Sequence, residues 1–271
     1  MSDRRTERSL GSQPVGHAPA HVVWHDLECG GYRADLGLWR ELAQRSGGRV
    51  LDVGAGAGRV SLDLARAGRA VTALDFDATL LAALDERAAG LEIETVCADA
   101  RSFSLERHDF GACLVPMQTI QLLGGTAGRV AFLRRAREHV RPGGVVACAI
   151  LGALEPFDCS DGGAGPAAER VHVDGLLYLS RATRVSELAK TVVIERERRV
   201  LDDHPGVAER ASWRRTAEAE RAPLRDSIEL DRVSARDLQR EAREAGLRPL
   251  QRLEVPATAE HVGSVVVVLG V

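Results

Sequence analysis

The fold class is indicated most clearly by Val50-Leu51-Asp52-Val53-Gly54-Ala55-Gly56-Ala57-Gly58-Arg59. A short apolar strand runs into a glycine-rich turn, and a helical pattern begins directly after the turn. Glycines permit tight backbone geometry and the close approach of a ligand. Free amide groups at the start of a helix favour a negatively charged group. The stretch therefore predicts a strand, a ligand-binding turn and a helix in succession.

Outward from this turn, short apolar runs alternate with helical patterns. Expected strands cover residues 49–53, 70–74, 91–97, 110–115 and 144–150, and expected helices cover 59–67, 78–89 and 127–140. Strands that read as continuous apolar runs, separated by helices, indicate a parallel sheet buried on both faces. We expect residues 248–255 and 264–271 to close this sheet as a hairpin-like pair.

Changes in composition and period divide the 271 residues into five segments. We expect a disordered tail (1–20), an N-terminal helical lid (21–48), a core (49–155), an antiparallel insertion (156–232) and a C-terminal helix with closing strands (233–271). In the insertion, residues 171–185, 191–201 and 226–233 alternate charged and apolar side chains, as strands with one wet face do. The insertion would cover the pocket or form a dimer surface. Ser234 and Asp237 form a capping-box pattern that opens the last helix.

Composition excludes several classes of function. The net charge is −3 and aromatic residues make up 4%, which argues against nucleic-acid or anionic-membrane binding and against stacking on single strands. The five cysteines form no C-x-x-C pair, so we expect no disulfide framework, no metal site and a reducing cytoplasm. We see no signal peptide or apolar span. The expected partner is a small molecule, and the protein would be a monomer or a homodimer.

Acidic residues follow the next two strands. Asp75 ends the strand about twenty residues beyond the glycine turn, where an acid can hold a ribose diol. Asp99 ends the following strand, where a carboxylate can accept from an adenine amino group and the Ala100 amide can bond a ring nitrogen. By the crevice rule for open α/β sheets, all these groups converge on one edge. The dinucleotide fingerprint G-x-G-x-x-G fails because Arg59 replaces its last glycine.

This constellation resembles the class I S-adenosylmethionine-dependent methyltransferases of the small-molecule type. The matching pieces are Leu51–Arg59, Leu74–Asp77, Ala98–Ala100, Phe110–Gln121 and Leu133–Val145. The resemblance implies a Rossmann-like, seven-stranded, mostly parallel sheet with an antiparallel last strand and helices on both faces. It also implies S-adenosyl-L-methionine as cofactor and S-adenosyl-L-homocysteine as product. The residues it assigns to the cofactor are Tyr32, Arg33, Gly54, Ala55, Gly56, Asp75, Phe76, Asp99, Ala100, Pro116 and Met117.

The fourth strand ends in Pro116-Met117-Gln118-Thr119-Ile120-Gln121. Nucleic-acid amino-methyltransferases of this family carry Asn/Asp-Pro-Pro-aromatic there, so the segment resembles the small-molecule enzymes instead. Gln118 and Gln121 are candidates to contact substrate. The alternative is that both cap the following turn.

Residues 24–35 resemble the lid that precedes the core in small-molecule members, with Tyr32 matching a tyrosine near the methionine end. Gly30 and Gly31 would allow the lid to hinge. Arg33 would pair with the methionine carboxylate as an always-charged donor. Tyr178 and Trp213 in the insertion are candidates to stack on a flat substrate or to pack internally.

Methyl transfer is a displacement at carbon, so the protein mainly aligns nucleophile, methyl and sulfur and excludes water. A base is optional, since a neutral amine attacks directly whereas a hydroxyl or carbon benefits from proton removal. The candidate catalytic residues are His25, Glu28, Tyr32, Gln118 and Glu155. The sequence predicts a methyltransferase of specialised metabolism acting on N, O or C. The alternatives are an NAD(P)-dependent oxidoreductase on a related sheet and a non-catalytic binding module.

Overall fold

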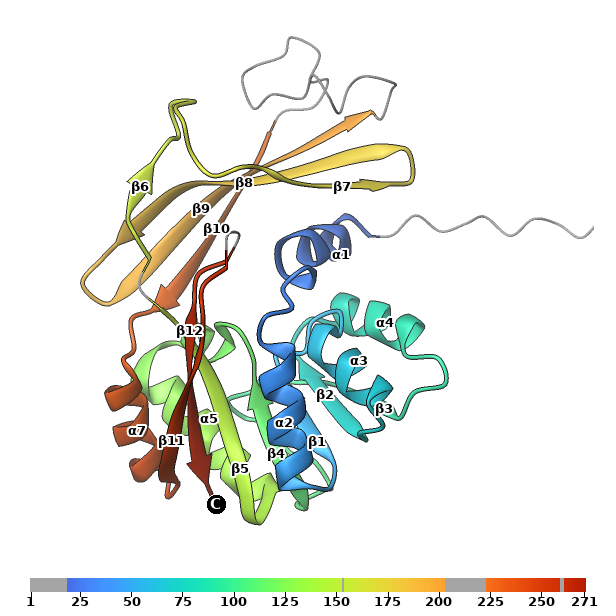
Figure 1. Cartoon of the computed structure of the whole chain (residues 1–271), viewed down its shortest axis with the longest axis vertical. Coiled ribbons are helices and arrows are strands. Elements are labelled where there is room, and N and C mark those ends of the chain that lie inside the picture. Colours follow the sequence, from blue (N-terminus) through green and yellow to red (C-terminus); the bar gives the residue numbers. More distant parts are fainter. Residues whose placement is uncertain (1–18, 153, 203–222, 259–260) are drawn as a thin grey trace, which may run out of the picture.

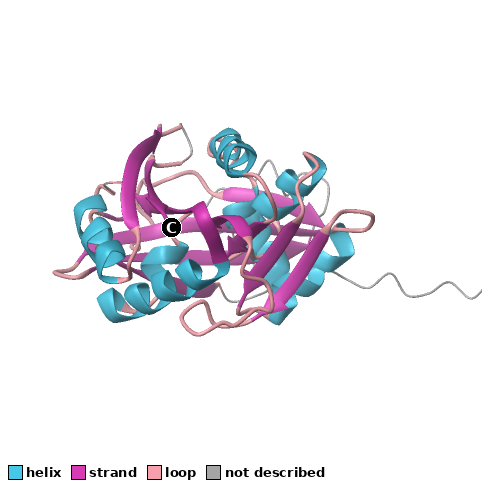
Figure 2. Cartoon of the chain, turned by 90° about the horizontal axis from the view of Figure 1, so that it is seen from below, coloured by secondary structure: helices cyan, strands magenta, loops and turns pink. Residues whose placement is uncertain are grey.

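Two β-sheets make up most of the protein, and helices cover the larger one on both sides (Figures 1 and 2). The computed structural model describes residues 19–152, 154–202, 223–258 and 261–271. Most of the expected N-terminal tail, Trp213 and part of the insertion lie outside these residues. Within the described ranges, no helix combines the length and apolarity that crossing a membrane requires.

The larger sheet has seven strands in the order β11-β12-β5-β4-β1-β2-β3. The strands are β1 Val50–Val53, β2 Val71–Asp75, β3 Ile93–Cys97, β4 Phe110–Val115, β5 Val140–Leu151, β11 Arg248–Val255 and β12 Ser264–Gly270. Strands β1 to β5 pair in parallel, whereas β12 runs antiparallel to both β5 and β11. The predicted sheet with an antiparallel last strand is confirmed. From β1 the chain continues to β2 on one side of the strand and later returns to β4 on its other side. The glycine turn after β1 therefore lies at the topological switch point of the sheet.

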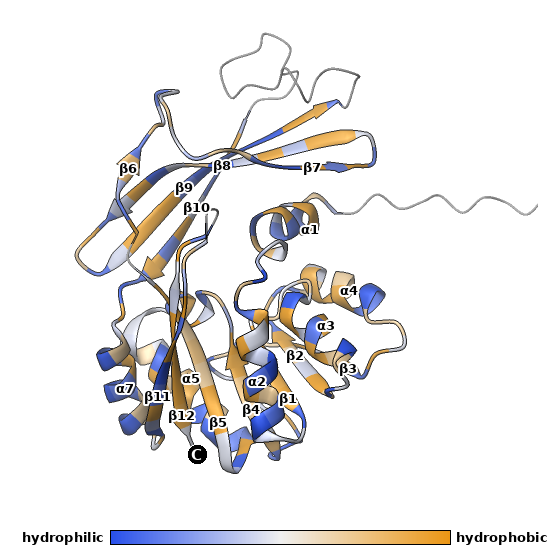
Figure 3. Ribbon diagram, viewed as in Figure 1, coloured by the Kyte–Doolittle hydropathy of each residue, from blue (hydrophilic) through white to orange (hydrophobic). Residues whose placement is uncertain are grey.

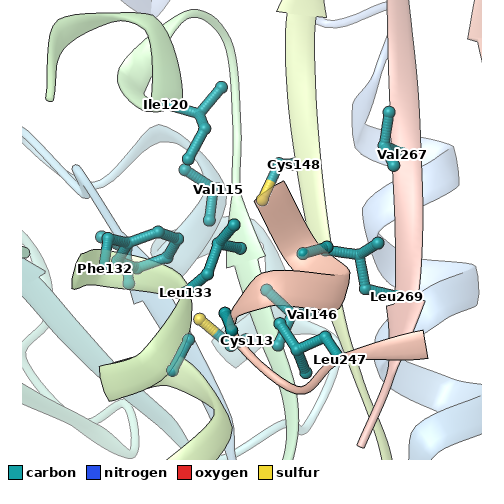
Figure 4. Packing of buried hydrophobic residues seen from close by; sticks show 14 of the residues in the cluster. Cys113, Val115, Ile120, Phe132, Leu133, Val146, Cys148, Leu247, Val267 and Leu269 are labelled. Atoms are coloured by element: carbon teal, nitrogen blue, oxygen red, sulfur yellow. The ribbon is translucent and has the colours of Figure 1, made fainter. Parts of the chain in front are cut away.

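Helices on the two faces bury this sheet. On one face lie α2 (Leu36–Ser46), α3 (Arg59–Arg66) and α4 (Ala78–Arg87), and on the other α5 (Gly125–His139) and α7 (Ala235–Glu244). Figure 4 shows Phe132 and Leu133 of α5 packed against Cys113 and Cys148 of the sheet. Every residue of β1 and β4 is buried, and Figure 3 shows the apolar character of the central strands. This explains why these strands read as unbroken apolar runs.

The second sheet is antiparallel and lies above the carboxyl edge of the first (Figure 1). Its strands are β6 Phe157–Asp158, β7 Glu169–Val173, β8 Leu176–Glu187, β9 Thr191–Asp202 and β10 Leu224–Asp231. The prediction of one strand over residues 171–185 is wrong, because β7 and β8 form a hairpin. Asp174 and Gly175 turn the chain with φ of 52° and 75°, as the tightest hairpins require. The alternation of charged and apolar side chains continues through such a two-residue turn, so the sequence pattern does not reveal the turn.

The N-terminal segment begins with α1 (Ala20–His25), which continues into a short π-helix, η1 (Asp26–Gly30). Its Val22 packs on Ala57 and Leu80 of the core, and its Trp24 packs on Tyr178 of the second sheet. The segment thus lies between the two sheets, as Figure 1 shows. We name residues 20–35, which span α1, η1 and the turn before α2, the lid.

Candidate functional site

The glycine turn is closely covered by two side chains. Gly54 and Gly56 have φ of 73° and 53°, a region that favours glycine. A Cβ on Gly54 would lie 2.4 Å from Oγ1 of Thr119, and one on Gly56 would lie 2.3 Å from Nε2 of His25. The turn therefore tolerates no side chain at either position, and His25 of the lid rests directly on it.

Asp75 stands at the predicted ribose position and fits that role. Its buried carboxylate accepts hydrogen bonds from the amides of Gly56 (2.7 Å) and Asp77 (2.9 Å). A carboxylate oxygen has two lone pairs, so both oxygens can still accept a hydroxyl. Phe76 follows with 81% of its surface exposed, which leaves a flat apolar ring beside the carboxylate. An acid next to an uncovered ring matches the sugar and base of a nucleoside.

Asp99, predicted to accept from adenine, is already engaged. Its carboxylate receives Nε (2.9 Å) and Nη2 (2.6 Å) of Arg101, and these contacts hold its pKa below the ordinary value. A bound adenine would share this carboxylate with Arg101. Ala100 is half-buried against the main core, so only its backbone is offered to a ligand.

The segment after β4 contains a strained residue. Pro116 is buried, and Met117 has φ of 53°, which is uncommon for a residue with a side chain. Such conformations cluster at functional sites and persist only where the surroundings impose them. Gln118 lies half-buried next to Met117 and begins the short helix η2 (Thr119–Leu122). The structure thus places Met117 and Gln118 at the carboxyl edge, where the sequence predicts them.

Gln121 has a structural role, which corrects the expectation that it contacts substrate. The side chain is buried, its Nε2 donates to the carbonyl of Asp231 (2.9 Å), and its Oε1 accepts from the amide of Leu151 (2.7 Å). Both polar ends are consumed in joining η2 to the ends of β10 and β5. The side chain therefore joins distant elements, and the alternative expectation that it caps the following turn is wrong as well.

Tyr32 lies buried between three other side chains. Its ring stacks on His261 with centroids 4.8 Å apart and an interplanar angle of 13°. The Arg59 guanidinium carbon lies 5.2 Å from the same ring. Burial raises the pKa of the Tyr32 hydroxyl, which hydrogen-bonds to the Ser264 side chain. This phenol therefore stays protonated at neutral pH. No sequence motif indicates His261, because this residue belongs to the β11–β12 loop, far from every motif.

The arginine held against Tyr32 is Arg59, whereas Arg33 is exposed. Arg59 donates to both carboxylate oxygens of Asp35, at 2.6 and 2.8 Å, and to the Tyr32 carbonyl at 2.9 Å. Trp39 Nε1 also donates to Asp35, at 2.8 Å. The side chains of Arg59 and Asp35 are only 7% and 3% exposed. Arg59, the residue that breaks the dinucleotide fingerprint, thus binds the lid to the core. In the sequence, the arginine in place of the last glycine was the one feature that could have indicated this role.

Glu28, which the sequence suggests as a candidate base, is poorly suited to that role. Arg198 donates to both of its carboxylate oxygens at 2.8 Å, and the Ser180 hydroxyl donates at 2.7 Å. Burial raises the pKa of Glu28, but these hydrogen bonds outweigh burial and leave the pKa lowered. The carboxylate is therefore committed to joining η1 to the second sheet.

The other two candidate bases lie in different surroundings. His25 Nδ1 is buried 3.8 Å from Oδ1 of Asp26, beyond hydrogen-bond distance, while Nε2 lies over Gly56. Glu155 is exposed on the connection between β5 and β6. The structure brings His25 onto the glycine turn but leaves Glu155 on the surface of the connecting segment.

The lid is fastened from both sides. Towards the core, Arg87 of α4 donates to both Asp26 oxygens, at 3.0 and 2.5 Å. Towards the second sheet, Trp24 meets Tyr178 edge-on with centroids 5.0 Å apart and an interplanar angle of 70°. Tyr178 is thus a packing residue rather than an open stacking platform. Neither Gly30 nor Gly31 adopts a positive φ, so the chain passes from η1 without glycine-specific geometry.

Comparison with known proteins agrees with this geometry. Residues 50–144 match the family described as a methyltransferase domain. The chain is 30% identical to a cypemycin N-terminal methyltransferase of a Streptomyces species over 126 residues, which cover 46% of this chain and 50% of that protein. The chain thus spans about half the length of the curated relative that it matches.

Solved structures share the fold over nearly the whole chain. The SAM-bound amino pentose methyltransferase CalS10 of Micromonospora echinaspora has a TM-score of 0.65 and 18% identity, covering 98% of this chain and 100% of its own. The sugar N-methyltransferase KedS8 of a Streptoalloteichus species has a TM-score of 0.65 and 16% identity, covering 99% of each chain.

Neither alternative function is favoured by the site. The position that a dinucleotide fold needs for its last glycine holds Arg59, whose side chain is bound to Asp35. The family match and the solved structures of the same fold are all methyltransferases, which does not favour a binding module without activity. The glycine turn at the switch point, the two acids and the strand order all agree with the family match. Residues 50–144 match the methyltransferase-domain family, and the fold of the chain is similar to that of S-adenosylmethionine-dependent methyltransferases of class I.

Proposed function

We propose that this protein transfers the methyl group of S-adenosylmethionine to an amine nitrogen of a small molecule. Nitrogen is favoured as the acceptor atom by the state of Glu28. This residue is the only carboxylate among the candidate bases of the lid. Arg198 and Ser180 occupy it and lower its pKa. A hydroxyl or carbon nucleophile benefits from a strong base, whereas a neutral amine attacks without one.

The cofactor supplies an activated methyl sulfonium, and the protein's residues bind and orient it. In this proposal Asp75 holds the ribose, Phe76 covers the adenine, and Asp99 receives its amino group. The backbone of Gly54–Gly56 follows the methionine portion. His25 and Tyr32 of the lid exclude water, so that the nucleophile, the methyl carbon and the sulfur stay in line.

The names of similar proteins support nitrogen as the acceptor atom. They refer to an N-terminal methyltransferase, an amino pentose methyltransferase and a sugar N-methyltransferase. The amino pentose enzyme belongs to calicheamicin biosynthesis, which supports a role in specialised metabolism for this chain too. All five cysteines are free thiols, which supports the proposed cytoplasmic location.

Transfer of labelled methyl to matched acceptors tests this function. Tritiated S-adenosylmethionine is incubated with methyl glucosaminide and with the dipeptide Ala-Gly, and each is paired with its N-acetylated form. We expect label only in the free amines. Label in an N-acetylated sugar at the same rate as in the amine would contradict nitrogen as the acceptor.

A variant of Glu28 tests the observation behind the proposal. Glu28→Gln keeps the carbonyl acceptor for Ser180 but removes the charge. We expect the pH dependence of methyl transfer to stay the same, even if the lid is loosened and the KM for S-adenosylmethionine rises. A loss of kcat with a displaced pH profile and unchanged S-adenosylhomocysteine affinity would show that Glu28 is a base.

A further inference from the structure

We propose that His261 is a catalytic residue that accepts the proton of the acceptor's ammonium group before methyl transfer. This inference rests on the proposed amine acceptor. It adds to the site a residue from the β11–β12 loop that no sequence motif indicates.

The topology brings His261 to the edge where the reaction is expected. Since β12 runs antiparallel to β5, the loop that precedes β12 lies at the carboxyl end of the parallel strands. Figure 1 shows the β11–β12 hairpin rising from the larger sheet towards the second sheet. Only β5 separates β12 from β4, the strand that leads into Pro116 and Met117. Met117 and Tyr32 also pack in the same apolar cluster.

His261 is held firmly in place. Its amide donates to Oγ1 of Thr258 at 3.0 Å, and its carbonyl accepts from the Thr258 amide at 2.8 Å. The Gly263 carbonyl accepts from the Gly152 amide at 2.9 Å, which fixes the loop to the end of β5. The imidazole itself lies flat on Tyr32. A ring held at both its backbone and its face is positioned as a catalytic group needs to be.

The imidazole is also available for proton transfer. In the described part of the chain, neither ring nitrogen of His261 has a hydrogen-bond partner. The charged groups acting on the Tyr32 ring at this stack are Arg59 and Asp35, which neutralise each other as an ion pair. Tyr32 is a neutral phenol bonded to Ser264. By contrast, Glu28 is bound by Arg198, and Glu155 is on the exposed connection.

The ammonium N–H bond breaks and its proton passes to a neutral ring nitrogen of His261, which becomes imidazolium. The freed lone pair on nitrogen forms the new N–CH3 bond as the S–CH3 bond breaks, and the bonding pair of that bond remains on sulfur. The products are the methylated ammonium and S-adenosylhomocysteine, and the imidazolium returns its proton to solvent. A histidine suits this step because a neutral imidazole nitrogen can accept a proton from the ammonium and later release it.

Sinefungin allows a test without knowledge of the acceptor, because it carries an amine where the cofactor carries its methyl group. The ratio of the Kd values for sinefungin and S-adenosylhomocysteine is measured by calorimetry from pH 5.5 to 8.5. If His261 faces that amine, the ratio of Kd for sinefungin to Kd for S-adenosylhomocysteine should rise about tenfold as the pH is lowered, because a protonated imidazole repels the ammonium group. Tenfold is the factor that corresponds to a coupling of one pKa unit.

Two variants separate proton acceptance from stacking. His261→Phe keeps a flat ring on Tyr32, and His261→Asn keeps a hydrogen-bond acceptor, but neither titrates. Both should give a ratio that is independent of pH, with the affinity for S-adenosylhomocysteine unchanged as evidence of an intact fold. A His261→Phe protein with the wild-type pH dependence would overturn the assignment. So would a flat ratio in the wild-type protein.

The failure of this inference differs from the failure of the proposed function. If the wild-type protein methylates amines but its sinefungin ratio is flat, only the role of His261 is wrong. If it binds neither ligand, the proposed function fails, and the inference that rests on it fails too.

Discussion

Removing the Arg59 guanidinium should destabilise the protein far more than removing a similar guanidinium on the surface. Among the described residues, Arg59 is the one cationic side chain that binds Asp35, and both side chains are almost fully buried. Arg59→Met would leave Asp35 as a buried charge with only the Trp39 indole donating to it. Breaking a buried pair by removing one partner costs about 3 to 5 kcal/mol, because the remaining charge is uncompensated.

The same pair of helices provides a matched control. Arg40 of α2 also binds an aspartate of α3 with two hydrogen bonds, to Asp63 at 2.7 and 3.0 Å, but its side chain is 50% exposed. Water and ions screen such a pair, so Arg40→Met should have only a small effect. Both variants are unfolded in urea, and the change in midpoint at constant slope gives the change in free energy.

A second substitution tests the mechanism. Asp35→Asn in the Arg59→Met background removes the orphaned charge and keeps an oxygen for Trp39, so most of the lost stability should return. If Arg59→Met shifts the urea midpoint no further than Arg40→Met does, the buried pair does not hold the lid as we argue. Failure of the double variant to recover stability would show that Arg59 acts through packing and not through charge.

Three further predictions concern single carboxylates and a histidine. Asp75→Ala should weaken S-adenosylhomocysteine binding roughly tenfold to a hundredfold in calorimetry, the loss of about 1.5 to 3 kcal/mol of hydrogen bonding to a charged group; unchanged affinity would refute the ribose role. Burial raises the pKa of Asp52 from 3.8 to about 6, so the free energy of unfolding of the wild-type protein should fall as the pH rises between these values. Asp52→Asn should flatten that part of the stability profile. Parallel profiles of the two proteins would show that Asp52 does not cause the change. Burial lowers the pKa of His139, whose Nε2 accepts from the Leu105 amide at 3.0 Å, so the stability of the protein should fall as the pH drops below 6.5. His139→Gln should remove that loss of stability in thermal melts. If the variant loses as much stability at acidic pH as the wild type, another group is responsible.

Local patterns predicted the core well because they report interactions between close neighbours in the chain. The apolar run before Gly54 and the helix after Gly58 appear where expected. The Ser234 capping box is confirmed, with the Asp237 amide donating to Oγ of Ser234 at 3.1 Å. The failed strand over residues 171–185 shows the limit of such patterns, since an Asp-Gly turn preserves alternation while it reverses the chain.

Partner choice between distant residues could not be predicted in this way. Glu28 reads as a free acid in the sequence, but Arg198, 170 residues further on, binds it. Gln121 reads as a pocket residue, but its two ends are used by the ends of β10 and β5. Each outcome depends on which side chains the fold brings within about 3 Å, and neither composition nor spacing encodes that distance.

Local sequence patterns sufficed to predict the strand–turn–helix at Gly54, the parallel core and the acids at the ends of β2 and β3, and with them the resemblance to the methyltransferases. These features depend on backbone conformation and on periodicity, which neighbouring residues impose directly. The contacts of Arg59 with the lid, of Arg198 with Glu28 and of His261 with Tyr32 follow only from the packing of distant segments. Desolvation and hydrogen bonding decide what each polar group can do, and both arise only when the lid, the β11–β12 loop and the second sheet pack together.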